Sequence, residues 1–173
     1  MDAQQGGPML DGLDFAGRLD AIEQRLDVRA ANPLPGGLTQ ADQDTGERWE
    51  AAQVWAHMAE FIGYWHEQFD TVIGQFAGEP VPFGRTKRDA GRIAAIEVGR
   101  QEPIEALVTR TRQALAAYRR RLAELSAPEW NAVGEHQTLG AMDMERMVER
   151  FVVGHLEEHL DQLDGLIGAP EGA

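Results

Sequence analysis

Three histidines carry the clearest chemical signal in this sequence. His155 and His159 are four residues apart in an amphipathic run from Met142 to Ile167, and His57 lies in a second such run much earlier in the chain. Positions i and i+4 of a helix differ by about 40° around its axis, so both rings of the pair lean over one surface. Three neutral imidazoles that converge from two helices make an open metal site. We therefore predict His57, His155 and His159 as ligands of a divalent metal.

The same histidines have a simpler structural explanation. The apolar neighbours of His155 and His159 place the pair on the inward side of its helix, where an imidazole loses water that must be replaced by a ligand or a hydrogen bond. A single histidine in such a place is more often a hydrogen-bonded core residue, and a pair strengthens the ligand interpretation. Spacing alone does not show that His57 faces the pair. Both interpretations stay open at this point.

Glu158 is the candidate catalytic residue beside the pair. It lies about 60° from His155 around the helix, which suits an orienting partner of that ring, a base, or an ordinary solvent-facing glutamate. The run from His155 to His159 also matches the H-x-x-E-H pattern of inverted zinc peptidases, in which the glutamate activates a water. That pattern is short enough to arise by chance, and those enzymes need a further acidic ligand well downstream. We do not expect a peptidase.

The other histidines and the nearby cations are not expected to join the site. His66 is about 180° around its helix from His57, which predicts a surface position. His136 falls in a predicted loop, where we expect it to be solvated, with a place near the mouth of the site as the alternative. Four cations follow a break rich in proline and glycine, and we expect them to solubilise a helix start, with contacts to substrate carboxylates as the alternative. These are Arg85, Lys87, Arg88 and Arg92.

Helical periodicity predicts the elements that must position these residues. Apolar residues at spacings of three and four, together with breaks at proline and glycine, predict four main helices and one short one. The main helices are expected at 10–31, 45–76, 103–126 and 142–167, with the last one opened by Asp143 or Gly140, and the short one at 86–99. Residues 127–140 are predicted to be irregular. No segment shows the sustained alternation of apolar and polar residues that would predict a sheet of consequence. The fold class is all-α, a four-helix bundle.

Composition limits the organisation and the partners. With 173 residues, 43% of them hydrophobic, the chain predicts one domain over 10–168, a flexible N-terminal tail at 1–9 and a C-terminal tail at 169–173. A net charge of −13 disfavours nucleic acid as a partner, and the run of three arginines at 119–121 reads as a solvated helix face. We expect no membrane span and no secretory signal, and therefore a cytoplasmic protein.

Two segments resemble signatures of the DinB/YfiT-like superfamily, which includes the mycothiol-dependent maleylpyruvate isomerases. Residues 45–65, TGERWEAAQVWAHMAEFIGYW, are similar to its second-helix signature, and residues 151–163, FVVGHLEEHLDQL, to its last-helix signature. The resemblance covers most of residues 10–168. It implies a four-helix bundle with a divalent metal, commonly zinc or nickel, held by His57, His155 and His159. The thiol-dependent isomerases usually carry glutamate where this chain has His155, so the sequence is closer to the three-histidine members.

The resemblance also implies a function. Enzymes of the family use the metal to activate mycothiol or bacillithiol as cosubstrate, so we expect a metal-dependent low-molecular-weight-thiol S-transferase or isomerase acting on an electrophilic substrate. The chain has no cysteine, so the thiol must come from outside it. A noncatalytic metal-binding or stress-response module is the first alternative. A dimeric interaction protein with unmetallated histidines is the second, and periodicity leaves a homodimer open.

Overall fold

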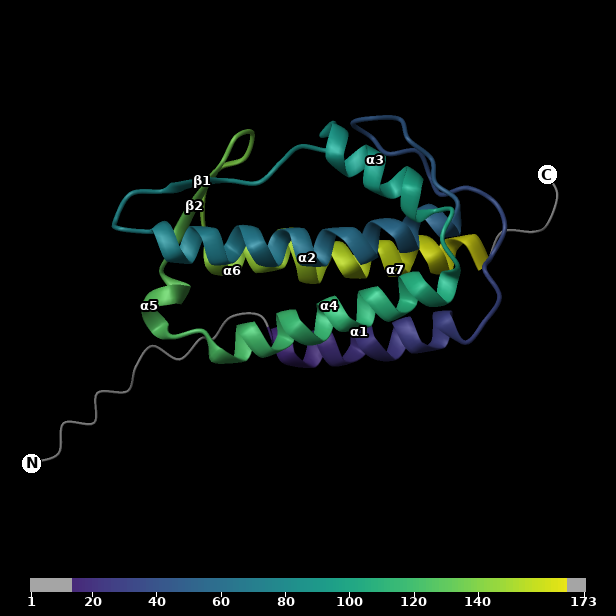
Figure 1. Ribbon diagram of the computed structural model, residues 1–173, viewed down its shortest axis with the longest axis horizontal. Coiled ribbons are helices and arrows are strands. Elements are labelled where there is room, and N and C mark those ends of the chain that lie inside the picture. The colour runs from purple at the N-terminus through teal and green to yellow at the C-terminus, as the bar shows by residue number, and fades with distance from the viewer. Residues whose placement is uncertain (1–13, 168–173) are drawn as a thin grey trace, which may run out of the picture.

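The computed structural model describes residues 14–167 and shows four long helical segments lying alongside one another as a bundle (Figure 1). The segments are α1 (Phe15–Ala30), α2 (Ala51–Gln75), α4 (Ile104–Glu124) and a C-terminal run of α6 (Met144–Val148), η1 (Glu149–Val153) and α7 (Gly154–Ile167). α2 and α1 each pack against both α4 and α7. The four-helix bundle is confirmed. The tails at 1–9 and 169–173 lie outside the described residues, so the domain boundaries stay predictions.

Side-chain caps determine where the helices begin. The Asp14 carboxylate accepts a hydrogen bond from the amide of Gly17 at 2.9 Å, and the Asp143 carboxylate accepts one from the amide of Arg146 at 2.9 Å. Such caps satisfy backbone donors that have no partner within the helix. Glu50 forms a reciprocal capping box ahead of α2. The second helix therefore starts at Ala51, six residues later than the sequence predicts.

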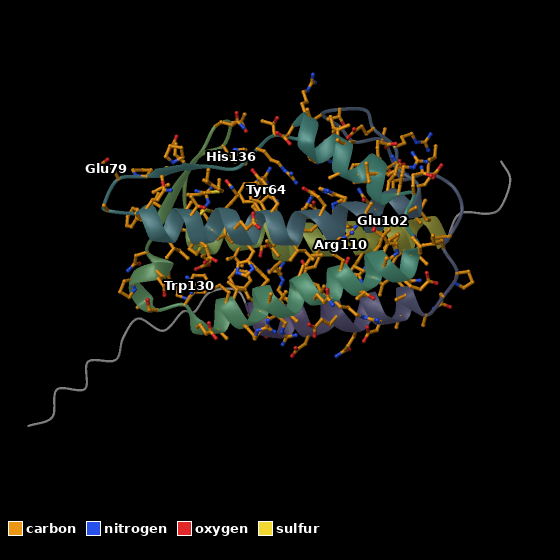
Figure 2. The ribbon with its side chains drawn as sticks, viewed as in Figure 1. Tyr64, Glu79, Glu102, Arg110, Trp130 and His136 are labelled. Carbon is orange, nitrogen blue, oxygen red and sulfur yellow. The ribbon has the colours of Figure 1, made fainter. Side chains whose placement is uncertain are left out.

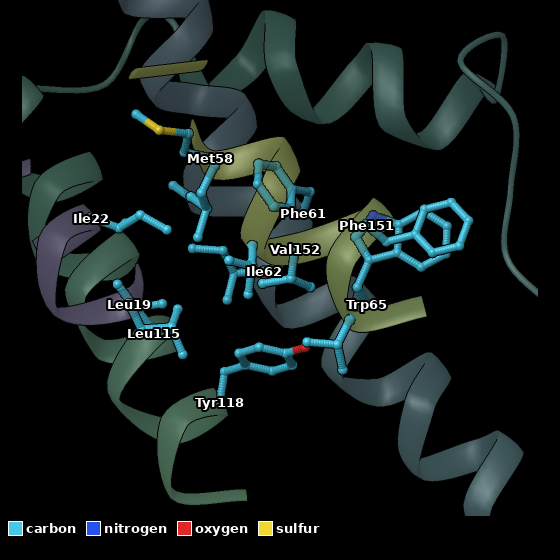
Figure 3. Close-up of a cluster of buried hydrophobic side chains, with 14 of the residues drawn as sticks. Leu19, Ile22, Met58, Phe61, Ile62, Trp65, Leu115, Tyr118, Phe151 and Val152 are labelled. Carbon is cyan, nitrogen blue, oxygen red and sulfur yellow. The ribbon is translucent and has the colours of Figure 1, made fainter. Parts of the chain in front are cut away.

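The core fills the space between the four segments with apolar side chains from each of them (Figure 3). Apolar residues that repeat every three or four positions are buried, such as Leu19, Ile22 and Leu26 of α1, although Ala16 of the same predicted stripe is exposed. The core residues that Figure 3 labels are Leu19 and Ile22 of α1, Met58, Phe61, Ile62 and Trp65 of α2, Leu115 and Tyr118 of α4, and Phe151 and Val152 of η1. Within residues 14–167, none of the helices combines the length and the apolarity that a bilayer crossing requires.

A three-stranded sheet lies at one end of the bundle, where the sequence predicts irregular chain. β1 (Val81–Phe83) pairs in parallel with β2 (Val133–His136), which pairs antiparallel with β3 (Gly140–Asp143). The all-α class holds, but the expectation of no sheet of consequence missed this small sheet. Strands of three or four residues are too short to show alternation, and β1 finds its partner about fifty residues away, beyond any local pattern. Two short helices complete the fold, α3 (Ala90–Gly99) and α5 (Ala127–Trp130).

Ion pairs join neighbouring helices over the surface of the bundle. Figure 2 labels a local ion pair, in which Arg110 of α4 donates to Glu102, in the turn before that helix, at 3.0 Å. Arg119 of α4 binds Glu23 of α1 at 2.8 Å, and Arg121 binds Asp70 of α2 at 2.7 Å. The arginine run at 119–121 is thus only partly a solvated face, because two of its three members hold α4 against other helices.

A π-helical turn interrupts the last segment just before the histidine pair. η1 ends at Val153, and a Cβ added at Gly154 would lie 2.8 Å from the carbonyl oxygen of Glu149. A π turn accommodates one extra residue, which rotates the following helix by about 100° relative to an uninterrupted one. Arg18 of α1 then holds both sides of the turn, at 3.1 Å from Glu149 Oε1 and 2.6 Å from Glu157 Oε2. The direction of the histidine pair depends on this turn.

Alanine substitutions at two glycines of α7 test whether the π turn of η1 requires glycine at position 154. Gly154→Ala should destabilise the fold because the new methyl group meets the Glu149 carbonyl, whereas Gly165→Ala meets nothing within 4 Å. The second substitution should raise stability by up to about 1 kcal/mol, the usual gain from alanine within a helix. Thermal unfolding of the two variants measures the contrast. Equal midpoints for both would contradict this account of η1.

Candidate metal centre

The three predicted ligands meet between α2 and α7. Nε2 of His155 lies 3.2 Å from Nε2 of His57 and 3.1 Å from Nε2 of His159. Ligand atoms of all three lie within 4.8 Å of one another. Two nitrogens bound tetrahedrally to one zinc at 2.0–2.1 Å are about 3.3 Å apart, so the spacing fits a shared ion. In the part of the chain that the structure describes, no fourth histidine or carboxylate joins the group.

Each ring turns its other nitrogen, Nδ1, toward an oxygen acceptor three residues further along the same helix. Side chains at i and i+3 share a helix face, so one turn supplies both the ring and its partner. The pairs are His155 with Glu158 Oε2 at 3.1 Å, His159 with Gln162 Oε1 at 2.8 Å, and His57 with Glu60 Oε2 at 3.5 Å. A proton on each Nδ1 leaves each Nε2 unprotonated, with its lone pair directed at the centre.

This arrangement leaves the converging nitrogens without a donor. If all three Nδ1 atoms carry the proton, three lone pairs face one another in a buried space, and a neutral cluster satisfies none of them. A cation at the common point would satisfy all three at once. The donor set therefore fits a divalent metal better than a purely hydrogen-bonded core.

Burial keeps the imidazoles of His57 and His159 neutral. His57 and His159 are 3% and 4% exposed. Burial lowers the pKa of both rings well below 6.5, and the neighbouring imidazoles lower each pKa further. Neutral imidazole is the form that binds metals. The side chain of His155 is 26% exposed, so this ring marks the side of the centre that faces solvent.

Aromatic side chains enclose the three rings. The Phe61 ring centroid lies 4.8 Å from that of His155 and 5.0 Å from that of His57. Trp49 stacks on His159 at 5.9 Å with an interplanar angle of 20°. Trp49 precedes α2 instead of lying on it, so the helical periodicity that located Phe61 assigned Trp49 to the wrong element. An apolar wall lowers the local dielectric constant and strengthens charge interactions at the centre.

Glu158 lies on the outer side of His155. Its side chain is 73% exposed, and the hydrogen bond with His155 lowers the pKa of the carboxyl. A surface pocket of about 340 Å³ borders it, lined on the remaining sides by Met142, Glu145, Arg146, Glu149, Arg150 and Gly154. None of the three histidines lines that pocket. The position of Glu158 suits an orienting partner of His155, and its catalytic role stays a prediction.

The two remaining histidines lie apart from the centre. His66 is partly buried, 3.5 Å from Asp70. The prediction that His136 is solvated is wrong, because this residue is 4% exposed on β2 (Figure 2). Its Nε2 donates to the carbonyl of Arg85 at 3.1 Å, and the amide of Thr138 donates to its Nδ1 at 3.3 Å. The sheet that buries His136 has no local sequence signal, which explains the error.

The four cations divide into two groups. Lys87 and Arg88 are exposed, as expected for a helix start. Arg92 is 7% exposed, donates to the carbonyl of Lys87 at 2.7 Å and lies 5.3 Å from the Trp49 ring. Arg85 binds the Glu60 carboxylate and covers the Tyr64 ring at 3.8 Å. The solubilising role is thus wrong for Arg85 and Arg92.

The lowered pKa values predict how the stability of the metal-free protein depends on pH. Above about pH 6.5 the folded and unfolded chains both hold His57 and His159 neutral. As the pH falls below 6.5, the unfolded chain binds protons that the folded chain excludes, so the free energy of unfolding should decrease. Urea unfolding between about pH 7.5 and 5.5 measures the slope. His159→Gln should flatten it and His66→Gln should not; equal slopes in parent and His159→Gln would refute the assignment.

Comparisons with known proteins identify the family and the fold. The family model described as the DinB superfamily matches residues 18–163. YfiT from Bacillus subtilis, a probable metal-dependent hydrolase with an unusual four-helix bundle topology, superposes with a TM-score of 0.64 at 14% identity, over 96% of this chain and 91% of that one. The comparison with curated proteins gave no match.

A mutant of the mycothiol-dependent maleylpyruvate isomerase superposes with a TM-score of 0.62 at 15% identity, over 91% of this chain. This chain spans only 62% of the isomerase. At these identities both likenesses concern the fold.

Proposed function

Because the chain belongs to the DinB superfamily, whose model spans residues 18–163, we propose that it binds a divalent metal through His57, His155 and His159 and acts as a metal-dependent low-molecular-weight-thiol S-transferase or isomerase. One observation carries the proposal: three Nε2 atoms converge while each Nδ1 faces an acceptor. Zinc and nickel are the proposed metals, and mycothiol or bacillithiol the proposed cosubstrate.

The number of protein ligands supports a reactive centre. Catalytic zinc sites hold the ion with three protein ligands and leave one position for water or substrate, whereas structural sites use four. When bound, such an ion lowers the pKa of a thiol in that position and keeps it as the nucleophilic thiolate. Because the chain has no cysteine, the thiol is a separate molecule.

The residues around the centre each have a defined part in this proposal. The buried rings of His57 and His159 stay neutral and available as ligands. Phe61 and Trp49 exclude water from one side of the rings. Glu158 holds a proton on Nδ1 of His155, the ring that faces solvent. Substrate would therefore approach past His155.

A noncatalytic metal-binding role is the alternative. Two observations speak for this role: His57 and His159 are buried, and none of the three histidines lines the neighbouring pocket. Coordination separates the two functions, because a closed site of four protein ligands is structural, while three ligands with exchangeable solvent allow chemistry.

Metal binding should stabilise the fold. Zinc added to chelated, untagged protein at about 100 times its dissociation constant stabilises the native state by about 2.7 kcal/mol, which corresponds to a rise of roughly 5–10 °C in the unfolding midpoint for a chain of this size. His155→Ala should abolish the rise, and His66→Ala should retain it. An equal rise in parent and His155→Ala would show that the metal binds elsewhere.

Catalysis should require the metal. We expect the zinc or nickel form to accelerate transfer of bacillithiol or mycothiol to an activated aryl halide, and chelation to abolish that acceleration, because the loaded centre would raise the fraction of bound thiol present as thiolate. Product formation followed by absorbance measures this. Activity that survives complete metal removal would refute the proposal, and a metal-loaded protein that is inactive with every thiol would favour the noncatalytic alternative.

A further inference from the structure

We propose that Glu60 and Arg85 are positioning residues, which hold the His57 ring so that its Nε2 faces the other two histidines. The link to metal affinity rests on the proposed function, whereas the orientation of the ring does not. The inference begins from two buried atoms. Nδ1 of His57 and Oε2 of Glu60 each lack a hydrogen-bond partner, and they lie 3.5 Å apart. A shift of a few tenths of an ångström joins them, with the proton on Nδ1.

Arg85 determines which oxygen of Glu60 is free for His57. Its guanidinium donates to Oε1 of Glu60, which leaves Oε2 on the His57 side. The guanidinium also lies 3.8 Å from the centre of the Tyr64 ring, and its side chain is only 11% exposed. A planar guanidinium held on two sides has little freedom. Glu60 is therefore fixed between Arg85 and His57.

The small sheet places Arg85. Gly84, directly after β1, has a φ of +85°, and a Cβ there would lie 2.6 Å from Cδ2 of His136. The amide of Gly84 donates to Gln68 of α2 at 2.7 Å. His136 of β2 donates to the carbonyl of Arg85. The backbone at Arg85 is thus held from both α2 and the sheet, so a network runs from β2 through Arg85 and Glu60 to His57.

Glu60 acts on the outer nitrogen of His57 and not as a fourth ligand. Its free oxygen faces Nδ1, and it is not among the residues that converge on the common point. A carboxylate on the outer nitrogen of a ligating histidine fixes its tautomer and raises its basicity, and its loss typically weakens metal binding by 10–100-fold. Glu60 is more buried than Glu158, with 16% of its side chain exposed against 73%, so it faces less competition from water.

Two readouts test the proposal. In the metal-free protein, nitrogen NMR of the imidazoles should show the proton of His57 on Nδ1, and Glu60→Met or Arg85→Met should shift it toward Nε2. In competition with a chromophoric chelator, both variants should bind zinc about 10–100-fold more weakly than the parent. Glu60→Gln keeps an acceptor oxygen and should restore part of the affinity. Arg121→Met removes an ion-paired arginine elsewhere on the bundle and should change neither readout.

Each outcome decides a separate point. An unchanged His57 tautomer in both methionine variants, with zinc affinity within about twofold of the parent, would overturn the proposal. If the parent binds no zinc, the proposed function fails, while the tautomer measurement on metal-free protein still tests the positioning role. If Glu60→Met does not fold, Arg85→Met decides the proposal in the same way. This variant leaves the Glu60 side chain in place and gives the same two readouts, the His57 tautomer and the zinc affinity.

Discussion

Three imidazole Nε2 atoms that converge inside a helical bundle are the constraint on which the rest of the structure depends. Nothing in the described part of the chain donates a hydrogen bond to all of them, and two of the rings are almost fully buried. A fold tolerates such a cluster only if something compensates it. A divalent ion would do so with the atoms already in place, which agrees with the spacing and the burial of the rings.

Several irregular elements around the centre orient the imidazole rings of the three histidines. The π turn of η1 and its Arg18 bridge set the direction of α7, and hence of His155 and His159. The sheet lies at the end of the bundle yet reaches His57 through Arg85 and Glu60. The elements that interrupt the regular bundle therefore have a role at the centre as well as in the core.

Local periodicity accounts for what could be predicted from the sequence. It located the four helices and the inward face of α7, because a helix repeats every 3.6 residues within one segment. It did not show the sheet, the burial of His136 or the position of Trp49, since these depend on pairing between distant segments and on a capping box. Glu60 was within reach: it follows His57 at the same spacing at which Glu158 follows His155, and the rule that singled out Glu158 applies equally to Glu60.

X-ray absorption of the zinc-loaded protein tests the central claim most directly, because it reports the ligands of the ion itself. The account predicts three imidazole nitrogens at about 2.0–2.1 Å and one further light atom, with the imidazole scattering reduced by one ring in His155→Ala. Four protein ligands would make the centre structural. An ion without imidazole scattering would show that the three histidines are not its ligands and would contradict the account.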